Sequence, residues 1–302
     1  MWEHPLPILA PRVISMEKTK RNQSLLMLTA SMAIVGTVGL LRRYIPLSSA
    51  ALAFARGLIG GLSLLGYTRL FRGGKRERIP GKKRWALMLN GVFLGINWML
   101  LFEAFNHTTI AVATLCYYLQ PTIVVLLSPL VFGEKLTAKK LGCAAAALLG
   151  MVLVSGVTDG GGAADGRGIA FGLGAAVFYS LVVILNKKIE GVDTYERTVI
   201  QLLSAAAAMA PYLLLTEGFS AIRFTPVTVL LVLAAGVVYT GLVYALYFGS
   251  MEALSAQTIA HLSYIDPVVA LLVSALVLRE SLSVRGILGA ALILGAAMLG
   301  GN

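Results

Sequence analysis

Residues 104–137 read AFNHTTIAVATLCYYLQPTIVVLLSPLVFGEKLT, and residues 250–283 read SMEALSAQTIAHLSYIDPVVALLVSALVLRESLS. Aligned without gaps at a shift of 146 positions, the two stretches share eight of their 34 residues. The identical pairs are Tyr118/Tyr264, Pro121/Pro267, Leu126/Leu272, Ser128/Ser274, Leu130/Leu276, Val131/Val277, Glu134/Glu280 and Leu136/Leu282. A shared apolar composition does not explain the Tyr-x-x-Pro and Glu-x-Leu motifs that recur at one spacing. The chain therefore contains an internal repeat.

The composition is that of a membrane protein. Of the 302 residues, 58% are hydrophobic and 13% are charged, and the mean hydropathy is +0.83. Soluble domains carry about 25% charged residues. These values exclude an ordinary soluble enzyme, a disordered chain and a secreted disulfide scaffold. The two cysteines, Cys116 and Cys143, lie in apolar runs and indicate neither a disulfide framework nor a zinc site.

Ten apolar segments are long enough to be considered as transmembrane helices, which need about 20 mostly apolar residues. They are residues 23–41, 48–69, 85–105, 108–132, 138–156, 168–186, 197–216, 226–250, 256–278 and 285–300. Several connections between them are very short, and short connections force neighbouring helices to run antiparallel. We expect an all-α integral membrane protein with ten transmembrane helices.

The repeat divides these helices into two groups of five. We expect a tail over residues 1–22, a first repeat over 23–156, an extracytoplasmic linker over 157–167 and a second repeat over 168–301. Because five is odd, the second repeat is inverted in the membrane relative to the first. Inverted repeats are typical of secondary transporters, which bind their substrate near the midplane between the halves. The alternative is a duplication that only enlarged the bundle.

The basic residues predict the orientation. With a cytoplasmic N-terminus, 18 Lys and Arg residues fall on the cytoplasmic side and six on the other, and Arg56 lies within a span. We therefore expect a multi-pass protein of the plasma (inner) membrane with both termini in the cytoplasm. The net charge of +11 then serves orientation and contact with the lipid bilayer, and indicates no nucleic-acid partner.

The start of the chain has a different character. Three prolines precede Met16, which is followed by a basic flank. We expect residues 1–15 to be a dispensable extension. A cleaved signal peptide is disfavoured, because the first apolar run is long enough to span and no A-x-A-like site follows it.

Two copies of one motif resemble a known family. Pro121 is followed by the turn GEKLT at residues 133–137, and Pro267 by RESLS at residues 279–283. With Arg56 in the second helix, the chain resembles the EamA-type transporters of the drug/metabolite transporter (DMT) superfamily. The resemblance implies transport of small metabolites, often export, with a pocket between the halves. Arg279 replaces the usual glycine of the second copy, and Asp266 is not a general family feature.

Asp266 is the strongest candidate for chemistry. It lies about ten residues into its predicted helix, or roughly 15 Å deep at 1.5 Å per residue. An ionised carboxylate at that depth costs about 2.5–3.5 kcal/mol, so burial favours the protonated form. Asp266 could couple protons to transport, hold a substrate amine, or form a structural pair with Arg56. Arg56 in turn could bind a substrate carboxylate, or tie helices together at carbonyl groups of a broken helix.

Further candidates lie in the same predicted helices. Pro121 and Pro267 each remove a helical hydrogen bond, and Gln120 and Asp266 precede these breaks at equivalent positions. His261 could relay protons near neutral pH, or serve as an interhelical hydrogen-bond partner. Polar and aromatic residues that could line the cavity, or pack between helices, are Asn97, Tyr118, Tyr179, Tyr244 and Tyr264. A tyrosine-lined cavity with one carboxylate would suit a cationic or zwitterionic solute.

These features favour a proton-coupled exporter of a small metabolite, such as an amino acid or amine, working without a cofactor as a monomer or homodimer. The sequence contains no G-x-x-x-x-G-K-[ST], H-E-x-x-H or G-x-S-x-G motif, so ATP hydrolysis, zinc-protease and esterase chemistry are not supported. An intramembrane enzyme acting on a lipid or isoprenoid remains the main alternative, with Asp266, His261 and Arg56 as its catalytic residues. A membrane sensor that transports nothing is the other.

Overall fold

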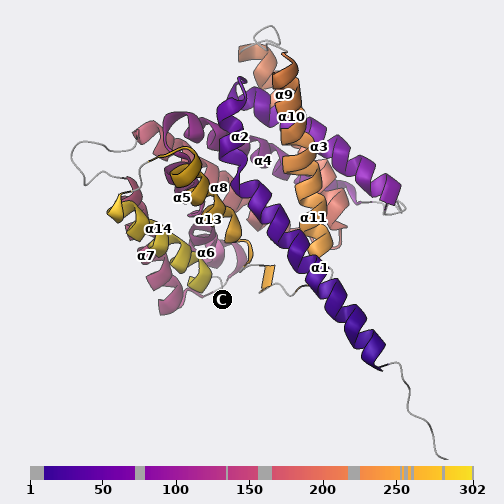
Figure 1. Ribbon diagram of the computed structural model, residues 1–302, viewed down its shortest axis with the longest axis horizontal. Coiled ribbons are helices and arrows are strands. Elements are labelled where there is room, and N and C mark those ends of the chain that lie inside the picture. Colours follow the sequence, from indigo (N-terminus) through magenta and orange to yellow (C-terminus); the bar gives the residue numbers. More distant parts are fainter. Residues whose placement is uncertain are drawn as a thin grey trace, which may run out of the picture.

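A computed structural model describes residues 10–71, 79–133, 135–155, 165–216, 225–251, 254, 258–259, 262–280 and 283–300 (Figure 1). Side chains are described from residue 19 onward, except at residues 155, 297 and 300. Within these ranges every regular element is a helix. His261, Glu134 and most of the linker between the repeats lie outside the described residues.

The helices follow the ten predicted segments. In the first half they are α1 (Ala10–Gly36), α2 (Val38–Tyr44), α3 (Ser49–Phe71), α4 (Gly81–His107), α5 (Ile110–Tyr117), α6 (Gln120–Phe132) and α7 (Ala138–Ser155). In the second half they are α8 (Gly166–Lys188), α9 (Thr194–Thr216), α10 (Pro226–Leu233), η3 (Ala234–Leu242), α11 (Val243–Ser250), α13 (Ile265–Leu272), η4 (Val273–Val277) and α14 (Val284–Gly300). The elements η3 and η4 are π-helical. Some predicted segments are therefore interrupted rather than continuous.

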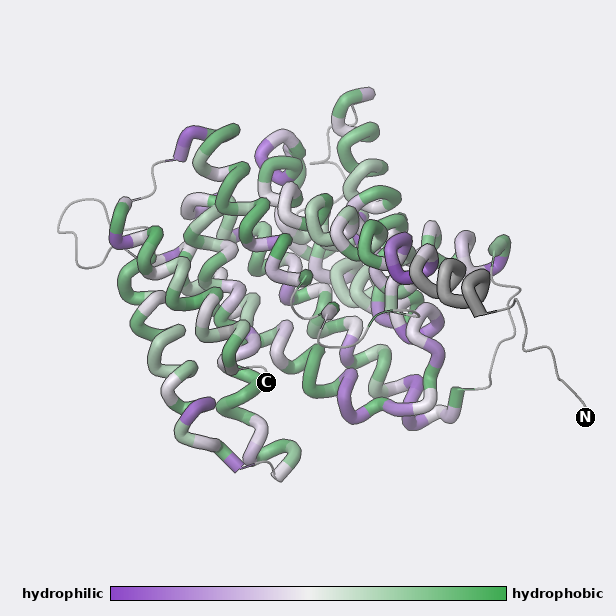
Figure 2. The backbone as a smooth tube through the Cα atoms, turned by 60° about the horizontal axis from the view of Figure 1, so that its bottom comes forward, coloured by the Kyte–Doolittle hydropathy of each residue, from purple (hydrophilic) through white to green (hydrophobic). Residues whose placement is uncertain are grey.

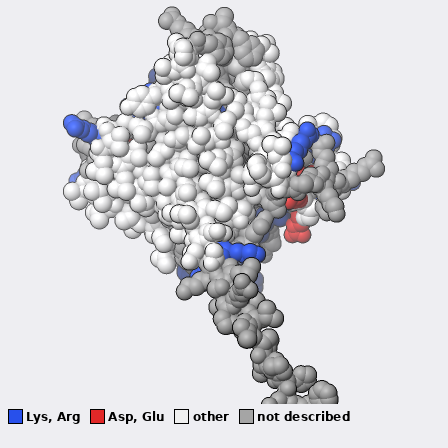
Figure 3. All heavy atoms as spheres, turned by 45° about the vertical axis from the view of Figure 1, so that its right-hand side comes forward, with Lys and Arg blue, Asp and Glu red and all other residues white. Residues whose placement is uncertain are grey.

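Within the described part of the chain, seven helices are long and apolar enough to cross a membrane. They are Thr19–Tyr44, Ser49–Phe71, Gly81–His107, Ile110–Phe132, Gly166–Lys188, Thr194–Thr216 and Pro226–Ser250. Two further apolar helices, Ile265–Val277 and Val284–Ala296, are shorter. Figure 2 shows hydrophobic residues along most of the helices, and the face in Figure 3 carries its Lys and Arg residues near the edges. The protein is thus a multi-pass helical membrane protein, and the count of ten spans stays a prediction.

Helix packing relates the two halves by a two-fold exchange. Helix α4 of the first half packs against α8 of the second. Their equivalents in the opposite halves, α11 for α4 and α1 for α8, also pack together. The contact between α4 and α9 has its counterpart in the contact between η3 and α3. The remaining large contacts, α3 with α9 and α7 with α14, join equivalent helices of the two repeats. The repeat seen in the sequence is therefore also a repeat of the packing.

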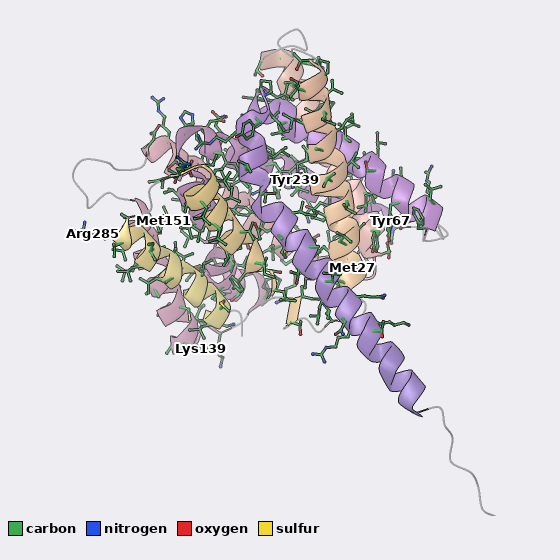
Figure 4. All side chains as sticks on the ribbon, in the orientation of Figure 1. Met27, Tyr67, Lys139, Met151, Tyr239 and Arg285 are labelled. Atoms are coloured by element: carbon green, nitrogen blue, oxygen red, sulfur yellow. The ribbon has the colours of Figure 1, made fainter. Side chains whose placement is uncertain are left out.

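The pair α7 and α14 shows the direction of this relation. A Cβ added to Gly150 would lie 2.6 Å from the carbonyl oxygen of Gly289, and one added to Gly289 would lie 2.5 Å from that of Gly150. Gly150 also faces Ile293, whereas Gly289 faces Val154. Residue numbers therefore rise along one helix as they fall along the other, so the two helices are antiparallel. Lys139 and Arg285 accordingly lie at opposite ends of the pair in Figure 4.

Helices α3 and α9 are antiparallel as well. Gly57 faces Leu202 and Ala206, and Gly61, one turn later, faces Leu202 and Leu203. Small residues let the two backbones approach closely, as in other membrane-helix contacts. A two-fold axis that relates antiparallel counterparts runs perpendicular to the helices. This is the relation that inverted repeats require.

Contacts between helix ends join residues that the charge pattern predicts to lie on the same side of the membrane. At the predicted outer end, Arg43 pairs with Glu280, and His107 Nδ1 lies 3.5 Å from Asp165 Oδ2. At the predicted inner end, Lys83 Nζ donates to the Glu190 carbonyl at 2.7 Å. Each of these contacts joins residues predicted on the same side, which agrees with the alternation of the predicted spans.

Candidate functional site

The site is built on two broken helices that occupy equivalent places in the two repeats. Helix α5 ends at Tyr117 and α6 begins at Gln120, with Pro121 in its first turn. Proline is favoured there because its missing N–H group is not needed. In the second repeat α13 begins at Ile265, one residue before Asp266, and it also has its proline, Pro267, in the first turn. Each proline therefore starts a new helix rather than kinking a continuous one.

The two breaks are joined by a hydrogen bond between the repeats. The Tyr118 hydroxyl lies 2.6 Å from Oδ2 of Asp266 and donates to its carboxylate. The two residues are 148 positions apart in the chain. Both belong to the predicted site, and the structure brings them into contact. Asp266 therefore has a polar partner from the opposite repeat at the point where both helices are interrupted.

Aromatic rings surround this pair. The ring of Tyr117 lies 5.4 Å from that of Tyr179 and 6.0 Å, edge on, from that of Tyr118. Tyr244, on α11, stacks on Phe248 at 5.6 Å. The four tyrosines and Asp266 are surrounded by protein, yet each keeps a partly accessible surface. These four tyrosines and Asp266 form an aromatic cluster around one carboxylate.

Arg56 lies near this aromatic cluster. It is buried, with its Nε donating to Thr240 Oγ1 at 2.9 Å and its Nη2 donating to the Tyr239 carbonyl at 3.2 Å. Its guanidinium also lies over the Trp98 ring, 4.5 Å from the centroid. Both hydrogen bonds reach η3, so Arg56 of the first repeat is bonded to a π-helical segment of the second. This is the geometry of the predicted structural role.

Arg56 and Asp266 are not in direct contact. Among the described residues no nitrogen of Arg56 lies within 4.0 Å of a carboxylate oxygen. The direct structural pair considered from the sequence is thus not present, and Asp266 has Tyr118 as its hydrogen-bond partner instead.

The other predicted residues take several positions. Asn97 is fully buried in the contact between α4 and α8, where its Nδ2 donates to the Ala175 carbonyl at 2.7 Å. Gln120 starts α6, and its carbonyl accepts from the Ser180 hydroxyl at 3.2 Å. Tyr264 is half-buried, directly before α13. Of these three, Gln120 and Tyr264 lie at the helix breaks, whereas Asn97 joins two helices.

Sequence reasoning missed two groups of polar residues. Thr240 and Trp98 hold Arg56, but π-helical backbone has no simple signal in the sequence, so the approach of Thr240 could not be read from spacing. Glu280 was noted only as part of a repeated motif. In the structure its carboxylate accepts from the backbone N–H of Ile110 at 3.1 Å. The recurrence of this acid in both copies was the available signal.

The turn before Glu280 has an unusual backbone. Arg279 has a φ of 53°, a left-handed conformation that side chains disfavour, and its counterpart Gly133 has a φ of 68°. Replacing the usual glycine by Arg279 therefore places strain in this turn.

We expect Arg279→Gly to raise the free energy of unfolding by about 1 kcal/mol, because glycine adopts this conformation without a steric cost. Thermal unfolding of the purified protein in detergent measures the change. The matched control is Arg279→Ala, which removes the guanidinium but keeps the strain and should give no gain. Equal stabilisation by both variants would contradict the strain argument.

Comparison with known proteins agrees with this architecture. The model of the EamA-like transporter family matches residues 22–156 and again residues 166–300. The "Uncharacterized transporter YxxF" of Bacillus subtilis (strain 168) is 28% identical over 261 residues, covering 85% of this chain and 82% of the relative. The "Uncharacterized transporter YvbV" of the same organism is 26% identical over 262 residues, covering 82% and 83%.

A solved structure described only as a crystal structure of a protein shares the fold. It superposes with a TM-score of 0.64 at 23% identity, covering 92% of this chain and 98% of that one. The family match takes in both repeats and nearly the whole chain. On this ground, and in accord with the two interrupted helices and the two-fold packing, the chain belongs to the EamA-like transporter family.

Proposed function

We propose that this protein is a secondary active transporter that moves a small metabolite by alternating access between its two repeats. The observation that carries the proposal is the Tyr118–Asp266 hydrogen bond, which joins the two repeats where both of their broken helices are interrupted. Alternating-access carriers bind their cargo between repeats, at discontinuous helices. The proposal also includes ten spans in an inverted arrangement, in the plasma (inner) membrane.

The chemistry of the site favours an amine-bearing solute. The Asp266 carboxylate can accept hydrogen bonds from an ammonium group, and the faces of Tyr117, Tyr179 and Tyr244 can attract its charge. The N-terminus of α6, with Gln120 in its first turn, favours a negatively charged group such as the carboxylate of an amino acid. The proposed cargo is therefore an amino acid or amine-like metabolite.

Proton exchange is the proposed source of energy. Asp266 is the carboxyl group of the aromatic cluster among the described residues, and an ionisable residue within a transmembrane segment marks a functional site by default. If Asp266 carries a proton on the inward step and binds the solute on the outward step, the proton gradient drives export of the solute. His261 is proposed as a second proton-carrying group on the strength of its sequence position alone.

The arrangement in the membrane is tested by reporter fusions. We expect a reporter within residues 72–84 to be active on the cytoplasmic side and one within residues 159–168 on the outer side. The reasons are the distribution of basic residues and the antiparallel crossing of equivalent helices. Two reporters found on the same side would contradict the inverted arrangement.

The cargo class is tested by thermal unfolding of the purified protein against a library of amino acids, amines and carboxylic acids. A solute that binds the native state raises the midpoint. We expect amine-bearing compounds to do so, and mass spectrometry should recover them unaltered after incubation. Stabilisation by a lipid or isoprenoid that is recovered as a new compound would favour the intramembrane enzyme instead.

A further inference from the structure

Glu280 joins both repeats at the predicted outer end of the protein. Its carboxylate accepts from the backbone N–H of Ile110, from the Ser274 hydroxyl, and from Nη2 of Arg43. Arg43 and Ile110 belong to the first repeat, whereas Ser274 and Glu280 belong to the second. The Glu280 side chain is only 10% exposed. A single acid thus holds together three helix ends, those of α2, α5 and η4.

The physical setting makes these contacts strong. Ile110 N–H is one of the amides at the start of α5 that no helical carbonyl can satisfy, so the carboxylate supplies its partner. A negative charge at a helix N-terminus is also favoured by the helix dipole. Hydrogen bonds between ionised groups, such as that from Arg43, are stronger than neutral ones. The three contacts therefore act as one charged junction.

The backbone around Glu280 holds the acid in place. Its own N–H donates to the Ser274 carbonyl at 3.0 Å, and the preceding residue, Arg279, adopts the strained left-handed conformation. Directly below, α2 and α5 are in close contact, because a Cβ added to Gly39 would lie 2.7 Å from the Ile110 side chain. The ends of α2 and α5 that Glu280 joins are therefore in direct contact with each other.

We infer that Glu280 is the outer latch of the carrier: its junction with Arg43 and Ile110 must break for the site between the repeats to open outward. This inference rests on the proposed function, because alternating access requires the repeats to separate at one end at a time. Breaking the junction moves the end of α2 away from η4. The weaker the junction, the larger the fraction of molecules that are open at this end.

The latch is tested by distance measurement between spin labels on the two sides of the junction. Tyr44, at the end of α2, and Leu276, in η4, are 63% and 73% exposed and can carry labels as cysteines in a Cys116→Ala/Cys143→Ala background. In vesicles we expect Glu280→Gln to raise the ratio of the longer-distance population to the shorter-distance one by about five- to thirty-fold. A loss of about 1–2 kcal/mol of interaction free energy corresponds to this range. Arg43→Gln should raise it less, since the contact with Ile110 remains.

Controls separate a latch from a merely structural residue. Glu190→Gln makes the same change at the predicted inner end and should leave the distances unaltered. A lower unfolding temperature of Glu280→Gln with an unchanged distance distribution would contradict the inference. If Glu280→Gln does not fold, Arg43→Gln decides. An unchanged distribution in a folded Arg43→Gln protein would then contradict it. If the distances shift but no solute is ever carried, the latch stands and the proposed transport fails. If solute is carried and the distances stay fixed, only the latch fails.

Discussion

Asp266→Asn is expected to abolish accumulation of the solute against its gradient when the only driving force is a pH difference, with a loss of at least about tenfold. The substitution keeps the shape of the side chain and its contact with Tyr118, but it removes the group that gains and loses a proton. Exchange of solute across the membrane needs no net proton movement and should continue, at lower affinity because the amide accepts more weakly than the carboxylate from the ammonium group of the solute. Reconstituted vesicles with an imposed pH difference measure accumulation, and the same vesicles without it measure exchange.

The matched control is Asp165→Asn, at the predicted outer end, where asparagine can still accept the hydrogen bond that Asp165 receives from the Arg167 backbone. It should leave both activities intact. If Asp266 only holds the amine of the solute and couples no proton, Asp266→Asn should reduce binding and exchange as strongly as it reduces pH-driven accumulation. Full pH-driven accumulation by a stable Asp266→Asn protein would remove Asp266 from the coupling mechanism.

Arg56→Gln should lower the free energy of unfolding by about 3 kcal/mol, with little direct effect on solute affinity. The substitution removes charged hydrogen bonds to Thr240 and to the Tyr239 carbonyl, and leaves buried polar groups without partners. The contact of the guanidinium with the Trp98 ring is lost too. Thermal unfolding in detergent gives the stability, and a titration with the identified solute gives the affinity.

Arg69→Gln is the control on the same helix, because Arg69 lies exposed near the end of α3 and should change stability little. A stable Arg56→Gln protein that binds the solute much more weakly would instead place Arg56 in the binding site. The double variant Arg56→Gln/Asp266→Asn adds a further check. Since the two side chains are not in direct contact, their effects on stability should add. Recovery of stability in the double variant would indicate a direct pair.

The sequence predicted the placement of helices well because span length and apolar composition are local properties. All ten predicted segments overlap a helix, and α3 and α7 begin within one residue of the predicted start. The interruptions were harder to place. The sequence showed Pro121 and Pro267, but the full break between α5 and α6 depends on how neighbouring helices satisfy the freed backbone groups. The contact of η3 with Arg56 was equally hard to predict, because Arg56 and Thr240 are 184 positions apart.

The site was predictable as a set of residues but not as a set of contacts. Asp266, Tyr118 and Arg56 stood out because ionisable and hydroxyl groups are rare in apolar segments. The sequence left open a structural pair between Asp266 and Arg56. Depth alone does not decide which way a side chain points, and the packing of α5 against α13 selects Tyr118 as the partner of Asp266. Asn97 has a similar polarity and lies between two helices instead.

The account depends most on the claim that the protein carries its solute across a membrane unaltered, and counterflow measures this directly. Vesicles containing the purified protein are loaded with unlabelled solute, chosen by the stabilisation screen, and diluted into a trace of the labelled compound with no pH difference. We predict a transient accumulation of label inside above its outside concentration, and recovery of the label as the original compound. Entry no faster than into protein-free vesicles, or recovery of the label as a different compound, would contradict the account.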